Sequence, residues 1–482
     1  IKAVMYAIIN NCLYINNFAS FAGGAIFADY LGEIVIYNSM FIENKEPKYG
    51  GAIYCRGVRI LTNKESIYKR NLATYGGAVQ FYNKYAVGNI IQNINCIFAF
   101  NEAKGRYGGI FQIGSSDVVK NIDTIFEENK AETSGGALRI SKGKIVLNLR
   151  CGFKKNKGKM CGGALRIKHV HILLNIESLF EDNIGNCGGC ITSHQIHNIS
   201  IISCSFKNNN AERDGGCITE EKGHILQVVN CKFEKNMANG GGAVNVDSVK
   251  IVIGKHNHFL GNKSYRDGGA IKISRGTKLI LINSFLYGNI AQKGDAGGVC
   301  AEMVTGFIKF SRCKFQSNIV RKASGAALDL SGATHILLIL CTVNANIAPR
   351  AYPGAVYIYH STKVDIKNSS FQENLRHAIG GSIYISRVGF IDIENSNFVL
   401  NATWGSIFYG RYINKLMSRN CLFYGGTIMI SGCNRTVLLY SIFTEAKKKS
   451  KDKGALMLTL NKVKEISVRG CKYLVNIGPS CT

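Results

Sequence analysis

The sequence is poor in proline and acidic residues, and it contains no long apolar segment. Only 4 of its 482 residues are proline, which argues against a flexible chain rich in linkers. No apolar run is long enough to span a bilayer as a helix. Asp and Glu total 31 against 59 Lys and Arg, so the formal net charge is +28.

This charge favours an acidic partner. An anionic glycan, an anionic membrane surface, nucleic acid and an acidic neighbouring subunit all fit. The basic residues are scattered, apart from one run at 447–451, and the chain has no nucleic-acid-binding module. Nucleic acid is therefore the least favoured partner. The alternative is a solvated basic surface without a dedicated partner.

Glycine is abundant at 53 residues, and much of it falls in one repeated block. The block reads Gly-Gly-Ala-Ile-Phe at Gly23–Phe27 and returns about every 27 residues, a period typical of a solenoid. If the second glycine or its substitute is taken as the anchor, the anchors are Gly24, Gly51, Gly77, Gly109, Gly136, Gly163, Gly189, Gly216, Gly242, Gly269, Gly298, Ala326, Gly354, Gly381, Gly405, Gly426 and Gly454.

A second motif, Phe-x-x-Asn, precedes most anchors, as at Phe153 and Asn156. A third apolar run lies between anchor and Phe, so each repeat holds three short strands. This pattern predicts an all-β parallel β-helix of about 17 coils. Glycine supplies the corner, the Phe rings stack in the core, and the Asn side chains form a ladder inside a bend.

The paired motifs resemble the polymorphic outer-membrane-protein repeats of bacterial and protist surface proteins. The resemblance covers nearly the whole chain and implies a right-handed parallel β-helix with a surface-exposed, adhesive role. It weakens after Gly298, where the coils become irregular. We expect one continuous domain over 1–482, with regular coils over 1–298 and less regular coils over 299–482. Because Ile1 is not a methionine, we expect a fragment or processed part of a longer chain.

The 17 cysteines favour small apolar core filling over a disulfide framework, because eight of them share one inward slot before the Phe. Disulfides between adjacent coils are the alternative in an oxidising compartment. The candidate pairs are Cys204 with Cys231, Cys190 with Cys217, Cys161 with Cys187, and Cys471 with Cys481.

Two polar columns are the candidates for chemistry, because equal offsets on neighbouring coils bring side chains together. His194, Glu221 and Asp247 lie five residues past their anchors and suggest acid–base catalysis on a polysaccharide. His171, His197 and His224 lie eight past and suggest a metal site or a pH-sensitive strip. The alternative is that both columns are solvated polar ladders, and we expect no cofactor.

A third column, three residues past the anchor, should face outward. It reads Phe27, Tyr54, Gln80, Gln112, Arg139, Arg166, Thr192, Thr219, Asn245, Lys272, Ala301 and Asp329. With one carboxylate, it weighs against a lyase that needs several acidic calcium ligands. It continues as Tyr357, Tyr384, Phe408, Met429 and Met457, an apolar stripe that predicts an interface or a carbohydrate platform. The alternative is a slip of register that places this stripe in the core.

Five glycosylation sequons occur, and those at Asn198, Asn368 and Asn434 are the better acceptors. Asn262 and Asn401 belong to the Phe-x-x-Asn motif, so we expect them to be buried. The longest coil carries extra residues at 83–88, a candidate recognition loop.

The sequence thus favours a non-enzymatic structural or adhesive rod, extracellular or at a cell surface, that stacks end to end with copies of itself. A lyase or hydrolase acting on acidic glycans is the first alternative. A basic scaffold subunit inside a large assembly, bound to other protein subunits, is the second.

Overall fold

The structure is a computed structural model, and it describes residues 5–83, 88–105, 109–348, 354–376, 381–400, 406–444 and 458–474. These residues form strands and turns without a helix. Accordingly, the described part of the chain offers no helix capable of crossing a membrane. The fold is an all-β parallel β-solenoid of about 16 turns in all.

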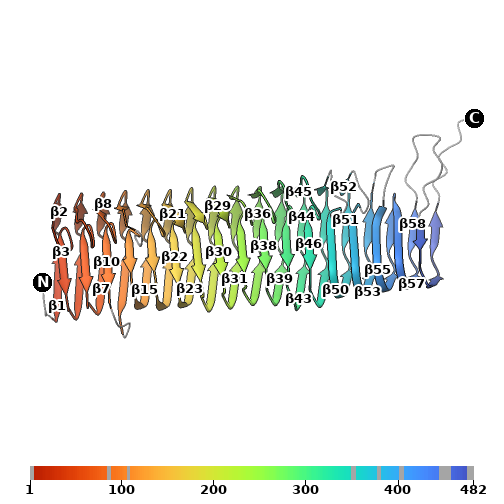
Figure 1. Ribbon diagram of the computed structural model, residues 1–482, viewed down its shortest axis with the longest axis horizontal. Coiled ribbons are helices and arrows are strands. Elements are labelled where there is room, and N and C mark those ends of the chain that lie inside the picture. Colours follow the sequence, from red (N-terminus) through yellow and green to blue (C-terminus); the bar gives the residue numbers. More distant parts are fainter. Residues whose placement is uncertain are drawn as a thin grey trace, which may run out of the picture. The chain divides into compact units, whose positions relative to one another are not determined.

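The chain divides into two compact units. Unit 1 comprises Ile1–Asn239 and Ala243–Val249, and unit 2 comprises Gly240–Gly242 and Lys250–Thr482. Within each unit, successive coils stack their strands in parallel into three sheets, and Figure 1 shows these strands as arrows that repeat side by side. The predicted fold class is confirmed.

One coil of unit 1 illustrates the plan. Strands β6 (Ile53–Arg56) and β7 (Ile60–Lys64) belong to the first sheet, with Gly57 at φ 66° between them. Strand β8 (Ile67–Lys69) belongs to the second sheet and β9 (Leu72–Ala73) to the third. The burial pattern of β7 alternates, so one face of the strand packs into the coil interior.

In unit 2 the two pieces of the first sheet merge into single long strands. These are β50 (Val356–Lys367), β53 (Ile383–Glu394), β55 (Ser406–Arg419) and β57 (Thr427–Leu439). The merged strands begin only at Val356, since β46 (Leu328–Ser331) and β47 (His335–Ile339) are still separate strands.

The two glycines at each corner are required for different structural reasons. Gly50 adopts φ 68°, a conformation that other residues disfavour. Gly51 is needed for space, because an added Cβ would lie 2.0 Å from the carbonyl oxygen of Gly77 on the next coil. The repeated Gly-Gly pair is thus fixed by one dihedral angle and one close approach.

The predicted ladders are both present in unit 1. Phe126, Phe153 and Phe180 stack with ring centroids 5.0 and 4.8 Å apart. The Asn129 side-chain nitrogen donates to Asn156 Oδ1 at 3.0 Å, and the Asn156 nitrogen donates to Asn183 Oδ1 at 3.1 Å. Each ladder asparagine also donates to a backbone carbonyl, so it fastens a coil to both neighbours.

A second asparagine ladder runs through the first sheet of unit 1. Its members are Asn63, Asn93, Asn121, Asn148 and Asn175, all fully buried. Each side-chain nitrogen of the first four donates to the next Oδ1 at 2.7 Å. At Asn63, the first member of this ladder, Oδ1 accepts a hydrogen bond from the Tyr68 hydroxyl at 2.8 Å.

Two expected positions in unit 2 are corrected by the register. Lys272 pairs with Cys300, so the anchor of that coil is Gly297 rather than Gly298, and Ala301 is buried. Tyr384 pairs with Tyr409 rather than Phe408, which is 1% exposed. The pairing of β55 with β57 is irregular between Ser406 and Phe408, where β55 contains one extra residue. This bulge shifts the register of the rest of the strand.

Candidate binding groove

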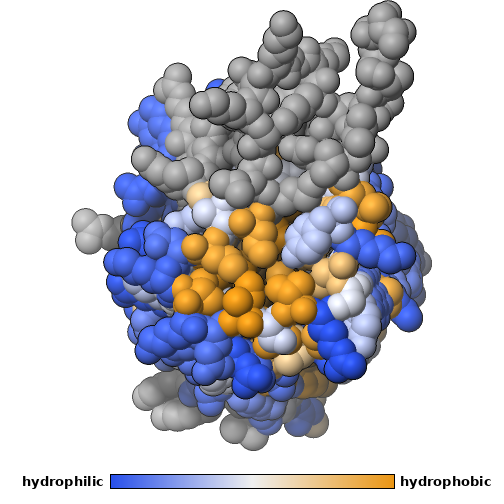
Figure 2. Space-filling view, turned by 90° about the vertical axis from the view of Figure 1, so that its right-hand side faces the viewer, coloured by the Kyte–Doolittle hydropathy of each residue, from blue (hydrophilic) through white to orange (hydrophobic). Residues whose placement is uncertain are grey.

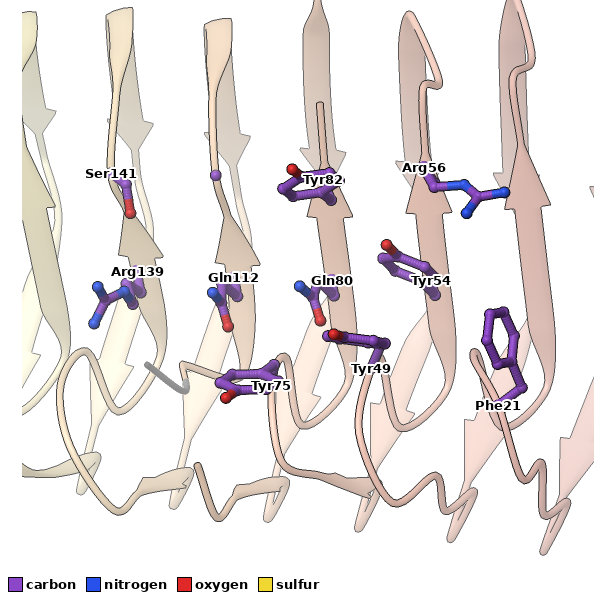
Figure 3. Close-up of a pocket in the computed structure, with 11 residues that line it drawn as sticks. Phe21, Tyr49, Tyr54, Arg56, Tyr75, Gln80, Tyr82, Gln112, Arg139 and Ser141 are labelled. Carbon is purple, nitrogen blue, oxygen red and sulfur yellow. The ribbon is translucent and has the colours of Figure 1, made fainter. Parts of the chain in front are cut away.

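A groove of about 620 Å³ lies along the outer side of the first sheet in unit 1 (Figure 3). Its lining comes from five successive coils and from the turns that precede their corners. The lining residues are Phe21, Tyr49, Tyr54, Arg56, Tyr75, Gln80, Tyr82, Gln112, Gly114, Arg139 and Ser141. Tyr54, Gln80, Gln112 and Arg139 belong to the outward column that the repeat spacing predicts.

Aromatic rings crowd one end of the groove. The rings of Tyr49 and Tyr54 stack with centroids 5.3 Å apart, and those of Tyr49 and Tyr75 with centroids 5.7 Å apart. Phe27 stacks on Tyr54 at 5.4 Å. Burial raises the pKa of Tyr54 to about 12. This end therefore combines flat apolar faces with phenol groups that stay protonated at neutral pH.

Two glutamines continue the row beside the rings. Gln80 on β10 (Val79–Tyr82) pairs in register with Gln112 on β14 (Phe111–Ile113), and Figure 3 shows the two side chains next to each other. Gln80 is 6% exposed. The Oε1 atom of each is buried without a hydrogen-bond partner among the described residues. These two oxygens are closed off from solvent, so the glutamines line the groove with their other side-chain atoms.

The opposite end of the groove is positively charged. Arg139 lines both this groove and a second cavity of about 500 Å³, whose walls also hold Arg166 and Lys168. Arg56, at the aromatic end, is engaged by Asp29 through two hydrogen bonds of 2.6 Å. The net attraction for an anion therefore increases toward Arg139.

The predicted acid–base column is assembled in unit 1. Strands β26 (Ile191–His194), β30 (Ile218–Glu221) and β34 (Val244–Asp247) place His194, Glu221 and Asp247 in adjacent register. His194 Nδ1 lies 3.3 Å from Glu221 Oε2. Burial lowers the pKa of His194, although Glu221 opposes this shift. The pair is suited to hold a neutral imidazole beside a carboxylate.

The histidine column is also present, and its rings are parallel. Centroids lie 4.7 Å apart between His171 and His197 and between His197 and His224. Ring nitrogens bind metals in the plane of the ring, so face-to-face rings do not converge on one ion. The described residues contain no group of three His, Cys, Asp or Glu side chains arranged to hold a metal.

Two buried carboxyl groups were not expected: the sequence analysis did not single out Glu220, and it placed Asp329 in the outward column. Glu220 is fully buried in unit 1, and burial raises its pKa to about 8. Asp329 in unit 2 is 6% exposed, and burial together with Asp295 raises its pKa to about 8. The sequence could have indicated Glu220, because it is an acidic residue at a repeat position whose side chain faces the core. Neither carboxyl lies in the groove.

The cysteines in the described ranges carry free thiols. The inward slot before the Phe is a core position, since Cys96, Cys151, Cys204 and Cys231 are each at most 2% exposed. Cys190 and Cys217 are fully buried at the anchor. Cys161 and Cys187 are half-buried and face each other in register. Cys471 is half-buried, and Cys481 lies outside the described residues.

The predicted apolar stripe of unit 2 is altered by the register. In the structure this stripe consists of residues that each pair in register with the next one on the following coil: Tyr357, Tyr384, Tyr409 and Met429. All four are half-buried on the outer side. Phe408 is a core residue, so its predicted place in the stripe is wrong. Met457 lies outside the described residues. Ring centroids of Tyr384 and Tyr409 lie 4.9 Å apart.

Other hydrophobic side chains are exposed at one end of unit 2. Leu460, Ile466, Val468, Tyr473 and Leu474 of its last described coil are 36–50% exposed. Figure 2 shows hydrophobic residues gathered on this end.

The sequon asparagines differ in accessibility. Asn368 follows β50 at φ 49° and is exposed, as is Asn434 on β57. Asn198 is half-buried on β27 (Asn198–Ile202), with its Oδ1 atom enclosed. Asn262 is fully buried in the ladder, as predicted. Asn401 and the loop residues 84–87 lie outside the described residues.

Comparison with known proteins gives a family match and several similar solved structures. The chain is similar to bacteriophage CBA120 tailspike protein 3 at 10% identity and a TM-score of 0.35. That similarity covers 94% of this chain and 57% of the tailspike. It is also similar to the PL6 family alginate lyase AlyGC at 8% identity and a TM-score of 0.22, over 97% of each chain. No curated protein matches the sequence.

The family match falls on the corner at Gly50 and Gly51. Residues 38–56 match the Chlamydia polymorphic membrane protein repeat. They contain Phe41 and Asn44 of one ladder step, the glycines Gly50 and Gly51, and strand β6. This segment of the parallel β-solenoid is therefore similar to a Chlamydia polymorphic membrane protein repeat.

Proposed function

We propose that the chain is a non-enzymatic adhesive protein of a cell surface whose unit 1 binds an extended acidic polysaccharide in the groove. The observation that carries this proposal is the row of aromatic rings, glutamine amides and arginine along five coils. A linear polymer suits a site that is long, open and built from repeated positions.

Each part of the row has a chemical match in a glycan. The half-buried rings of Tyr49 and Tyr75 give the groove an apolar wall with hydroxyl groups, against which a sugar ring can pack. The amide groups of Gln80 and Gln112 line the groove beside these rings and suit hydrogen bonding to sugar hydroxyls. The positive charge of Arg139 suits a carboxylate or sulfate group.

Binding to immobilised polysaccharides tests the proposal. The probes are alginate, polygalacturonate and heparin, with neutral dextran as the reference. We expect retention of an acidic polymer that falls at least tenfold in Tyr75→Ala with Gln80→Ala. The matched control is Tyr287→Ala, since Tyr287 is a 45%-exposed tyrosine of unit 2. Equal binding by the groove variant and the control would refute the proposal.

A second candidate function is polysaccharide cleavage, favoured by the 3.3 Å approach of His194 and Glu221. Asp247 adjoins Glu221 in register, as a pair of catalytic carboxyls would require. The described residues that line the groove include no carboxylate, which favours binding. Release of new reducing or unsaturated ends from the same polymers, abolished by Glu221→Gln, would establish the enzyme instead.

A further inference from the structure

Cys161 and Cys187 occupy the same corner of consecutive coils in unit 1. They end strands β21 (Lys157–Cys161) and β25 (Ile184–Cys187), which pair in parallel with these two residues in register. Neighbouring parallel strands lie about 4.8 Å apart, within the Cα separations that a disulfide bridges. The backbone therefore admits a bond between the two sulfurs without rearrangement.

The two thiols differ in their electrostatic surroundings. A cavity of about 500 Å³ opens at Cys161 and is lined by Arg139, Arg166 and Lys168. The hydrogen bond from Cys187, together with Arg166 and Lys168, lowers the pKa of Cys161. The pKa of Cys187 is raised, because it shares that hydrogen bond and is buried. The cationic surroundings therefore favour the thiolate form of Cys161.

The opposite pKa shifts also occur in the Cys204 and Cys231 pair, but the other candidate pairs lack the exposure and the cationic surroundings of Cys161. Cys204 and Cys231 are 2% and 1% exposed, and Cys190 and Cys217 are fully buried. Neither pair lines the cationic cavity. They pack as core side chains, whereas Cys161 is reachable from solvent beside three cationic groups.

We propose that Cys161 and Cys187 form a thiol–disulfide exchange site for small anionic disulfides of the glutathione type. The Cys161 thiolate attacks one sulfur of the small disulfide, forms a mixed disulfide and releases one thiolate. The Cys187 sulfur then attacks Cys161, which breaks the mixed disulfide and releases the second thiolate. The Cys187 proton ends on one leaving group and the other leaves as a thiolate, which takes its proton from solvent; the two protein sulfurs are oxidised to a disulfide and one disulfide is reduced.

The cationic cavity selects the reagent. Arg166 and Lys168 attract carboxylates of the incoming disulfide, so the anionic reagent reacts faster than a cationic one. This site does not depend on glycan binding, although Arg139 borders both cavities.

Reaction of the reduced full chain with oxidised glutathione and with cystamine tests the proposal. Peptide mass spectrometry after alkylation measures each cysteine separately, so the wild-type chain supplies its own buried controls, Cys204 and Cys231. We expect Cys161 to react at least tenfold faster than Cys204, and to react faster with glutathione disulfide than with cystamine. The stable product should be a Cys161–Cys187 disulfide.

Two variants resolve the order of the steps. Cys187→Ser should accumulate a mixed disulfide on Cys161, whereas Cys161→Ser should leave Cys187 as a free thiol. Arg166→Ser with Lys168→Ser should remove the preference for the anionic reagent. Labelling of Cys161 no faster than Cys204, or a Cys187→Ser chain that traps no mixed disulfide, would overturn the proposal.

Discussion

The hydroxyl oxygen of Ser324 lies 2.7 Å from a carboxyl oxygen of Asp329. The same hydroxyl lies 2.7 Å from Asp295. A hydroxyl has one hydrogen, so it cannot donate to both carboxyls. The arrangement that satisfies all three groups is a protonated Asp329 donating to Ser324, which donates to Asp295. The raised pKa of Asp329 agrees with this chain.

Stability should therefore decrease as pH rises in the neutral range. The pKa of Asp329 is 3.8 in an ordinary setting and about 8 in the folded protein, so the folded state binds this proton more tightly than the unfolded state. Its contribution is complete below about pH 4 and is lost as pH rises through about 8. At about 1.4 kcal/mol per pKa unit, the rise from 3.8 to about 8 corresponds to a loss of roughly 6 kcal/mol.

Asp329→Asn should flatten this pH dependence, measured as the thermal midpoint between pH 5 and pH 9. Glu220 has a pKa raised in the same direction, so Glu220→Gln should remove a second part of the slope. Identical slopes in wild type and Asp329→Asn would contradict the protonated chain.

Removing one rung of the asparagine ladder should be costly. Asn156 accepts from the backbone and side chain of Asn129 at 3.2 and 3.0 Å and donates to Phe126 O at 2.9 Å. Asn156→Ala leaves these buried groups without partners, so we expect a loss of about 2–5 kcal/mol in urea unfolding. Asn186→Ala, which removes an exposed bond to Glu212, should cost less than about 0.5 kcal/mol. Equal costs would show that the ladder adds nothing.

The two kinds of glycine should respond differently to alanine. Gly163→Ala places a Cβ 2.0 Å from the carbonyl oxygen of Gly189, so we expect a loss above about 4 kcal/mol or failure to fold. Gly288 adopts φ 63° with open space around it, so Gly288→Ala should cost only about 1–2 kcal/mol. Thermal unfolding of the two variants checks the ranking, and a tolerated Gly163→Ala would contradict the close approach.

Expression in a host that attaches N-glycans tests the sequons. We expect occupancy at the exposed Asn368 and Asn434 and none at Asn262, whose amide is buried in the ladder. Peptide mass spectrometry before and after enzymatic deglycosylation measures each site. A glycan on Asn262 would mean that modification precedes folding of its coil.

The sequence was sufficient for the corner and for the Phe-x-x-Asn ladders, because both motifs recur at a nearly fixed step. It also held an unused signal for the second ladder. Asn148 precedes Asn156 by eight residues, and Asn175 precedes Asn183 by the same interval. When two asparagines recur at the same interval in successive repeats, each of them lies above its counterpart on the neighbouring coil. The interval therefore predicts two separate asparagine ladders.

The groove and the stripe were harder to predict, for different reasons. Tyr49 and Tyr75 reach the groove from the turns before the corner, and a column count at one offset cannot include them. Phe408 was misplaced because one extra residue in β55 reverses which side chains face inward. Motif spacing gives the register of a coil only until the first bulge.

The asparagine ladder of unit 1 also bears on how such a chain changes length over evolution. Asn129, Asn156 and Asn183 are 27 residues apart, and each makes the same bonds to the next. Gain or loss of one whole coil leaves matching partners on both sides, whereas a shift of a few residues within a strand does not. Duplication of a coil in the middle of the groove would therefore move its aromatic end and its cationic end apart by the height of one coil, and both ends would stay intact.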